Sequence, residues 1–128
     1  MAPLVSVCVA ALLAISGAGF ARQPPPLIST ARSLPPNVSR QAAIAALGPA
    51  TWAVIPKDTG DYRLHGSREL YRLYWAVPGC VPVDIGFDAS GRAVGVGAPN
   101  LCGADAAGMT ALPASRSCAK ADRRRLCK

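Results

Sequence analysis

Few residues of this chain have types and spacings that could support catalysis. Its one histidine, His65, precedes a Gly-Ser pair, and no Gly-x-Ser-x-Gly segment offers it a nucleophile. Asp84 and Asp88 are four residues apart, which on a strand separates them by about 13 Å, beyond the ~5–9.5 Å of glycosidase carboxylate pairs. Residues 95–97 (Gly-Val-Gly) lack the third glycine and the helix of a nucleotide-binding loop. We therefore expect no enzymatic activity, no catalytic residues and no cofactor.

Four of the five cysteines have spacings typical of disulfide bonds. Cys8 lies inside an apolar segment, and the others, Cys80, Cys102, Cys118 and Cys127, are separated by 22, 16 and 9 residues. Zinc sites usually pair their thiols two to four residues apart, so zinc is the less favoured use. An even number of cysteines in a short exported chain indicates two disulfides, for which three pairings exist. We expect disulfides and no bound metal.

The positive charge of the chain is concentrated at its C-terminal end. The formal net charge is +7. From residue 116 onward, six basic residues against one acidic residue give +5, which leaves +2 for the preceding part. The candidate anion-binding residues are Arg123, Arg124, Arg125 and Lys128, held in a loop if Cys118 and Cys127 are joined. A solvated end that only aids solubility is the alternative interpretation.

The first 21 residues have the features of a cleavable signal peptide. Leu4–Ile15 is apolar apart from Ser6, and the small residues Gly19 and Ala21 suit cleavage after position 21. As a helix these twelve residues would extend about 18 Å, short of the ~30 Å core of a bilayer. A retained anchor or a buried core helix is the alternative. The prediction is an exported protein, periplasmic or extracellular, which does not span the membrane after processing.

The remaining chain divides into three segments. Residues 22–36 contain five prolines without an apolar period, so we predict a mostly disordered linker. Residues 37–103 are predicted to form a single small α+β domain, in which a short N-terminal helix packs on a three-stranded antiparallel β-meander stapled by disulfides. Residues 104–128 form the predicted basic C-terminal tail.

The predicted helix has clear ends, and the strands follow from alternation. Ser39 can cap a helix that ends at Leu47, because Gly48 suits a helix end and Pro49 cannot continue it. Residues 52–55 could be a strand or the start of a second helix. From residue 70 onward the period becomes two, which indicates strands with one apolar face. That face comprises Tyr71, Leu73, Trp75, Val77, Val81, Val83, Ile85, Phe87, Val94 and Val96.

The strand register follows from keeping apolar residues opposite each other. A three-residue loop over 78–80 sets Val77 against Val81 and Trp75 against Val83, and a four-residue turn over 88–91 sets Val83 against Val96 and Ile85 against Val94. Extending this ladder places Cys80 opposite Pro99, about 10 Å of chain from Cys102. We therefore predict a Cys80–Cys102 disulfide and, by elimination, a Cys118–Cys127 disulfide.

Residues 38–97 resemble the SmpA/OmlA (BamE) family, small outer-membrane proteins of the bacterial β-barrel assembly machinery. The resemblance is carried by the helix ending in Leu-Gly-Pro at 47–49, the aromatic strand at 71–75, and the segments 83–88 and 91–94. It implies a helix followed by an antiparallel sheet and a role in contacts with envelope proteins. The β-lactamase inhibitor protein shares this plan. The chain lacks the lipidated cysteine of the outer-membrane members.

Two classes of non-enzymatic function remain after these considerations. The first is an envelope domain that binds another envelope protein through a strand edge or through the polar sheet face bearing Arg72, Tyr74 and Asp84. The second is a domain whose basic tail binds anionic membrane lipid headgroups or polysaccharide. A secreted inhibitor is a third possibility, by analogy of fold alone. No specific nucleic-acid partner is expected.

Overall fold

A serine cap starts the predicted helix, which becomes α2 (Arg40–Leu47) in the computed structural model, whose described residues are 23–60 and 68–128. The Ser39 hydroxyl accepts from the Ala42 amide at 3.1 Å, and the Gly48 amide closes the last turn on the Ile44 carbonyl. Helix α2 has the predicted position and the predicted cap. The predicted signal peptide lies outside the described residues.

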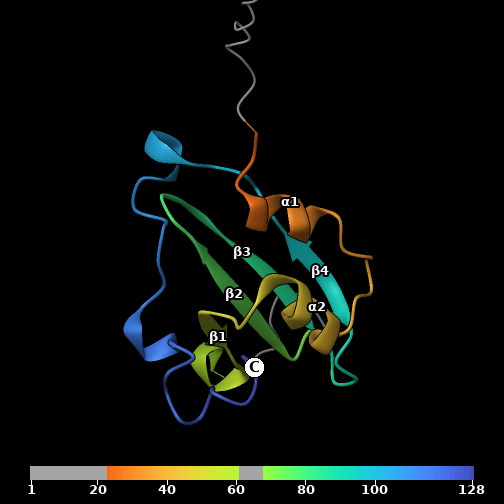
Figure 1. Ribbon diagram of the computed structural model, residues 1–128. Coiled ribbons are helices and arrows are strands. Elements are labelled where there is room, and N and C mark those ends of the chain that lie inside the picture. Colours follow the sequence, from red (N-terminus) through yellow and green to blue (C-terminus); the bar gives the residue numbers. More distant parts are fainter. Residues whose placement is uncertain (1–22, 61–67) are drawn as a thin grey trace, which may run out of the picture.

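A four-stranded antiparallel sheet follows α2, in the order β1-β2-β3-β4 (Figure 1). The strands are β1 (Trp52–Val54), β2 (Tyr71–Val77), β3 (Cys80–Phe87) and β4 (Ala93–Gly97). The α+β class is confirmed, whereas three strands were expected. Strand β1 resolves the ambiguity at residues 52–55: Ala53 pairs with Leu73 and is fully buried, so tertiary pairing selects the strand.

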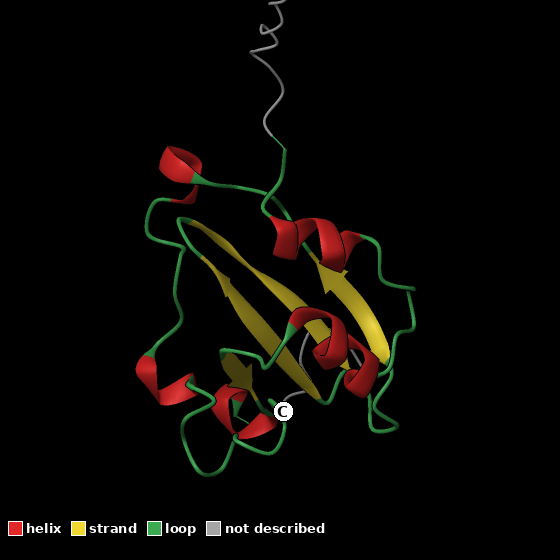
Figure 2. Cartoon of the chain, in the orientation of Figure 1, coloured by secondary structure: helices red, strands yellow, loops and turns green. Residues whose placement is uncertain are grey.

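The segment predicted as a linker contains a further helix, α1 (Pro26–Arg32), so that prediction was wrong for these residues. Pro26 occupies the first helical position, where its missing N–H is not needed. Ile28 and Ala31 are buried, at 0% and 1% exposure. Both helices cover one face of the sheet (Figure 2). The buried side chains of Ile28 and Ala31, one helical turn apart, are enough to pack this proline-rich segment against the core.

The core lies between that face of the sheet and the two helices. Its largest fully buried side chains are Trp75, Phe87, Ile28, Leu73, Ile85, Val83 and Cys127. The Trp75 indole N–H donates to the Gly48 carbonyl at 2.8 Å, so the helix end is tied to the sheet. Tyr71 and Phe87 stack with ring centroids 5.5 Å apart. The predicted apolar face of β2 and β3 is therefore the core face, except at Val81, which is only partly buried while Cys80 is buried opposite Val77.

The first hairpin has the predicted register in its body and a different one at its turn. Trp75 lies opposite Val83 as predicted, but Val77 lies opposite Cys80, with a bulge between Trp75 and Val77. The loop is therefore Pro78-Gly79, with Gly79 in the left-handed region at φ 73°. At the bulge, Ala76 of β2 faces two residues of β3, Val81 and Pro82. The Ala76 amide donates to the Thr51 hydroxyl at 2.9 Å, which satisfies it outside the β2–β3 ladder.

The register predicted for the second hairpin was wrong. Ile85 pairs with Val96 rather than Val94, a shift of two residues. One residue comes from the connection, which has five residues (88–92) rather than four before the Phe87–Ala93 pair, and the other from a bulge at Val94. Asp88 holds the turn, because its carboxylate accepts from the amides of Ser90 and Arg92. These hydrogen bonds lower the pKa of Asp88, with that from the Ser90 side chain the largest cause.

The C-terminal segment packs against the domain and is not a free tail. After the 3-10 turns Gly103–Ala106 (η3) and Ala114–Arg116 (η4), Ser117 forms a bridge with Trp52 on the outer edge of β1. Covering an edge strand in this way blocks further strand pairing there. Ala106 and Cys127 are buried. The chain from 104 to 128 is thus part of the α+β domain.

Candidate anion-binding loop

Both predicted disulfides are present. Cys80 pairs with Cys102, and the two residues also form an antiparallel bridge at the turn end of β3. Cys118 pairs with Cys127 across nine residues. We call the segment 117–128, closed by this second disulfide, the basic loop.

Arg123 anchors the basic loop from inside and is not available to a ligand. Its side chain is 3% exposed, and its guanidinium donates to both carboxylate oxygens of Asp58, at 2.5 and 2.7 Å. The same group donates to the Ala53 carbonyl at 2.7 Å. The sequence groups Arg123 with its two neighbours as an anion-binding residue, but the structure makes it the buried half of an ion pair.

Asp58 is the partner that sequence reasoning did not identify. It lies in the 3-10 turn Pro56–Thr59 (η2), where its carboxylate also accepts from the Ile55 amide at 2.9 Å. The hydrogen bond from Arg123 is the largest cause lowering its pKa to about 2. Its turn position gave a local explanation for an aspartate there. Its pairing with Arg123, 65 residues away in the sequence, produces no local sequence pattern from which it could be predicted.

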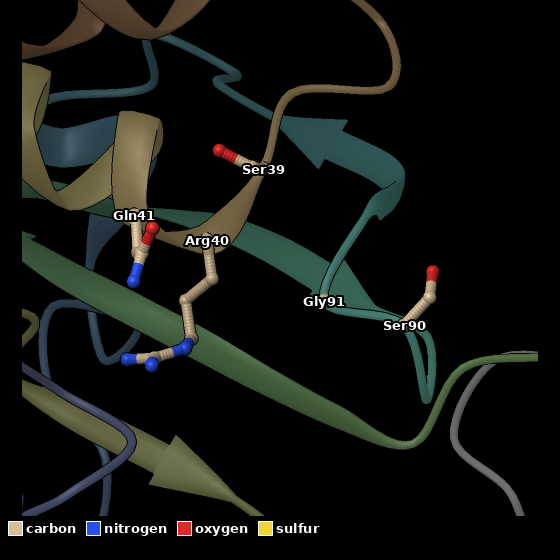
Figure 3. Close-up of a pocket in the computed structure, with 5 residues that line it drawn as sticks. All are labelled: Ser39, Arg40, Gln41, Ser90 and Gly91. Atoms are coloured by element: carbon tan, nitrogen blue, oxygen red, sulfur yellow. The ribbon is translucent and has the colours of Figure 1, made fainter.

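Arg40 holds the other end of the basic loop. From the start of α2, its Nη1 donates to the main-chain carbonyls of Leu126 at 3.1 Å and Lys128 at 3.0 Å, with a longer contact to Arg125. Arg40 also lines a shallow polar pocket of about 280 Å³ with Ser39, Gln41, Ser90 and Gly91 (Figure 3). The Ser39 hydroxyl and the Arg40 guanidinium are already used as cap and clamp, so this pocket has a structural explanation.

The cations left on the surface of the basic loop are those that no acidic residue neutralises. Asp122 is engaged by Lys57, with Nζ 2.5 Å from Oδ2. The remaining exposed basic residues of the loop are Lys120, Arg124, Arg125 and Lys128. Three of the four predicted anion-binding residues are thus exposed, and Lys120 joins them. The loop presents them from a fixed backbone, because a disulfide, a buried ion pair and the Arg40 clamp all hold it.

The predicted partner-binding residues of the sheet lie together, but they bind one another. Arg72 forms ion pairs with Asp84 and with Glu69, and its Nε donates to Glu69 Oε2 at 3.0 Å. Glu69 is 2% exposed and was not predicted. The available signal was its i,i+3 spacing to Arg72, with opposite charge. Tyr74 lies opposite Asp84 in the sheet.

Glycines of β3 and β4 make room for the ion triad formed by Glu69, Arg72 and Asp84. A Cβ at Gly86 would overlap the Glu69 carboxylate, and one at Gly97 would come within 2.6 Å of Asp84 Oδ2. Burial acts to lower the pKa of Arg72, but the hydrogen bond that Arg72 donates to Glu69 and the charge of Asp84 outweigh it, so the pKa is raised. Burial, with the charge of Asp84, raises the pKa of Tyr74. The two carboxylates stabilise the Arg72 guanidinium on the polar sheet face, and only part of this guanidinium is accessible to a ligand.

The described residues give little support for other catalytic or metal-binding sites. His65 lies outside the described residues. Across residues 23–60 and 68–128, no three His, Cys, Asp or Glu side chains group so as to hold a metal ion. A second pocket of about 360 Å³ lies beside the Cys80–Cys102 disulfide, lined also by Gln23, Pro25, Asn100 and Asp105.

No helix in the described part of the chain is long and apolar enough to cross a membrane. Comparisons with protein-family models, curated proteins and solved structures give no match for this chain.

Proposed function

We propose that this protein is a non-enzymatic exported module that attaches to anionic polymers or lipid headgroups of the cell envelope through the basic loop. The observation that carries the proposal is the fixed display of Lys120, Arg124, Arg125 and Lys128, with the nearby carboxylates of Asp58 and Asp122 already neutralised. Long cationic side chains on an ordered backbone attract anions without first ordering the chain that carries them.

The expected affinity is weak and reversible. Each basic residue near an anionic surface contributes about 1 kcal/mol, so four contribute about 4 kcal/mol, which corresponds to a dissociation constant near 1 mM. The large exposed apolar side chains among the described residues are Leu70, Val96, Leu101 and Met109, and they lie outside the basic loop. The proposed attachment is therefore electrostatic, with no insertion of the loop into the acyl region.

Vesicle binding at two ionic strengths tests this function. The wild-type protein is expected to sediment with phosphatidylcholine vesicles containing phosphatidylglycerol at low salt and to be released at high salt, because salt screens exposed charges. A variant with Lys120, Arg124, Arg125 and Lys128 changed to Gln should not sediment. Neutral phosphatidylcholine vesicles are the control. Equal binding of the wild type and the variant to the anionic vesicles at low salt would refute the proposal.

A protein partner at the polar sheet face is the second candidate. Asp84 retains 24% exposure of its side chain and lies beside Tyr74, which is partly exposed, so the triad offers some surface to another chain. The order of helices followed by an antiparallel sheet supports the proposed relation to the SmpA/OmlA (BamE) family, and the inhibitor role also stays a proposal. Tyr74→Ala should abolish capture of an envelope protein at high salt, whereas loss of the basic loop cations should not.

A further inference from the structure

We propose that Lys120 and Arg124 together form a subsite for one phosphate group, an inference that rests on the proposed function. The Arg124 amide donates to the Lys120 carbonyl at 3.0 Å, the i→i+4 bond of an α-helical turn. Side chains with this spacing lie on one face of the turn. The Arg124 Nη2 also donates to the Ala119 carbonyl at 2.9 Å, so the guanidinium is held at the peptide group that precedes Lys120.

The charges at this turn are not balanced within the described part of the chain. None of the ion pairs found there involves Lys120 or Arg124. The carboxylate within the basic loop, Asp122, is engaged by Lys57, and Asp58, which contacts the loop, is engaged by Arg123. Like charges one helical turn apart repel each other. An anion bound between them would replace this repulsion with two attractions.

The donor chemistry favours phosphate. Arg124 uses one Nη2 hydrogen bond for the Ala119 carbonyl, so its other N–H groups remain available as a fork for two phosphate oxygens. Lys120 supplies a compact charge with three donors. The buried Arg123 and the Cys118–Cys127 disulfide hold the turn in place, so the two cations need little further ordering.

Two matched double variants test the subsite. Lys120→Gln/Arg124→Gln and Arg125→Gln/Lys128→Gln each remove two positive charges from the basic loop, so diffuse attraction falls equally in both. Binding of pyrophosphate is measured by calorimetry or by amide chemical shifts, together with sedimentation of phosphatidylcholine vesicles containing phosphatidic acid. The first variant should lose about tenfold more affinity than the second, since only it removes the paired donors. Thermal melts verify that both variants fold, as expected for exposed positions.

The outcomes separate the subsite from the proposed function. Equal losses in the two variants would overturn the subsite and leave a diffuse electrostatic surface. No binding of the wild type to either probe at low salt would overturn both. A selective loss with pyrophosphate supports a phosphate-bearing polymer as the natural source. A selective loss with phosphatidic acid vesicles alone supports a lipid headgroup.

Discussion

At the scale of single residues, three adjacent arginines have different surroundings. Arg123 is buried against Asp58, whereas Arg124 and Arg125 are exposed. Arg124 alone of the two has a side-chain hydrogen bond among those described, to the Ala119 carbonyl. The run of three like residues therefore combines one structural cation with two that face solvent.

Arg123→Gln should destabilise the protein by about 3 kcal/mol, because it removes one partner of a buried ion pair and leaves Asp58 without its bidentate donor. Arg124→Gln is the matched control and should change stability by less than about 0.5 kcal/mol, as for other exposed positions. Urea denaturation of both variants measures the difference. Equal stability of the two would show that Arg123 is not held as described.

Asp58 gives the fold a dependence on acidic pH. Its pKa is about 2 in the folded protein, against ~3.9 in an unfolded chain, so its ionisation stabilises the folded state by about 2 kcal/mol above pH ~4. This stability is lost as the pH falls from about 4 to about 2, where the folded-state carboxylate takes up its proton.

The Asp58→Asn variant isolates that contribution, because it cannot ionise. The difference in unfolding free energy between wild type and Asp58→Asn should shrink by about 2 kcal/mol between pH ~6 and pH ~2. Denaturant melts across this range measure it. A difference that stays constant with pH would mean that Asp58 is not responsible for the acid sensitivity.

At the scale of elements, glycines in the sheet make room for charged side chains. The strands β3 and β4 contribute Gly86, Gly95 and Gly97 to the face opposite the core, next to the Glu69–Arg72–Asp84 triad. These glycines cost conformational entropy in a strand. The positions of Gly86 and Gly97 are explained by the carboxylates of Glu69 and Asp84, which lie where a Cβ would be.

Gly86→Ala should destabilise the sheet by about 1–3 kcal/mol, because the new methyl group displaces the Glu69 carboxylate from Arg72. Gly95→Ala is the control, since its Cβ would come no closer than 3.8 Å to Arg72 Nη2, an ordinary contact. That variant should be neutral or slightly stabilising, because alanine loses less entropy on folding. Thermal melts of the pair compare them, and equal destabilisation would contradict the proposed fit of the triad.

At the scale of the whole molecule, segments from both ends of the described chain complete the domain. Helix α1 buries Ile28 against the core, and the basic loop buries Cys127. In Figure 1 the start of α1 and the basic loop lie at opposite ends of the molecule. A tag placed before α1 would therefore leave the proposed binding surface free.

Ile28→Ala should cost about 2–5 kcal/mol, the usual price of deleting a fully buried isoleucine. Ser29→Ala, at an exposed position of the same helix, should be close to neutral. Denaturation of the two variants distinguishes a helix packed on the core from a linker. If Ile28→Ala were also neutral, residues 26–32 would have no part in stability.

The sequence by itself determined features that depend on local chemistry or on period. The cap and end of α2 follow from Ser39 and from Gly48-Pro49. The Cys80–Cys102 pairing was also predicted, although from a second-hairpin register that the structure shifts by two residues. The core faces of β2 and β3, and with them the body of the first hairpin, follow from alternation. Each of these features is set by residues close in sequence or by a two-residue period.

Only the tertiary structure decided which charged residues are exposed and where the strand register shifts. The partner of Arg123, Asp58, lies 65 residues away in the sequence, so the composition of a basic tail could not show that Arg123 is buried. The bulges, at Val81-Pro82 in β3 and at Val94 in β4, interrupt the two-residue period, and Ala76, opposite the first bulge, is satisfied by Thr51 from outside the hairpin. Helix α1 is too short to show a period, and it is stabilised by the core that it covers.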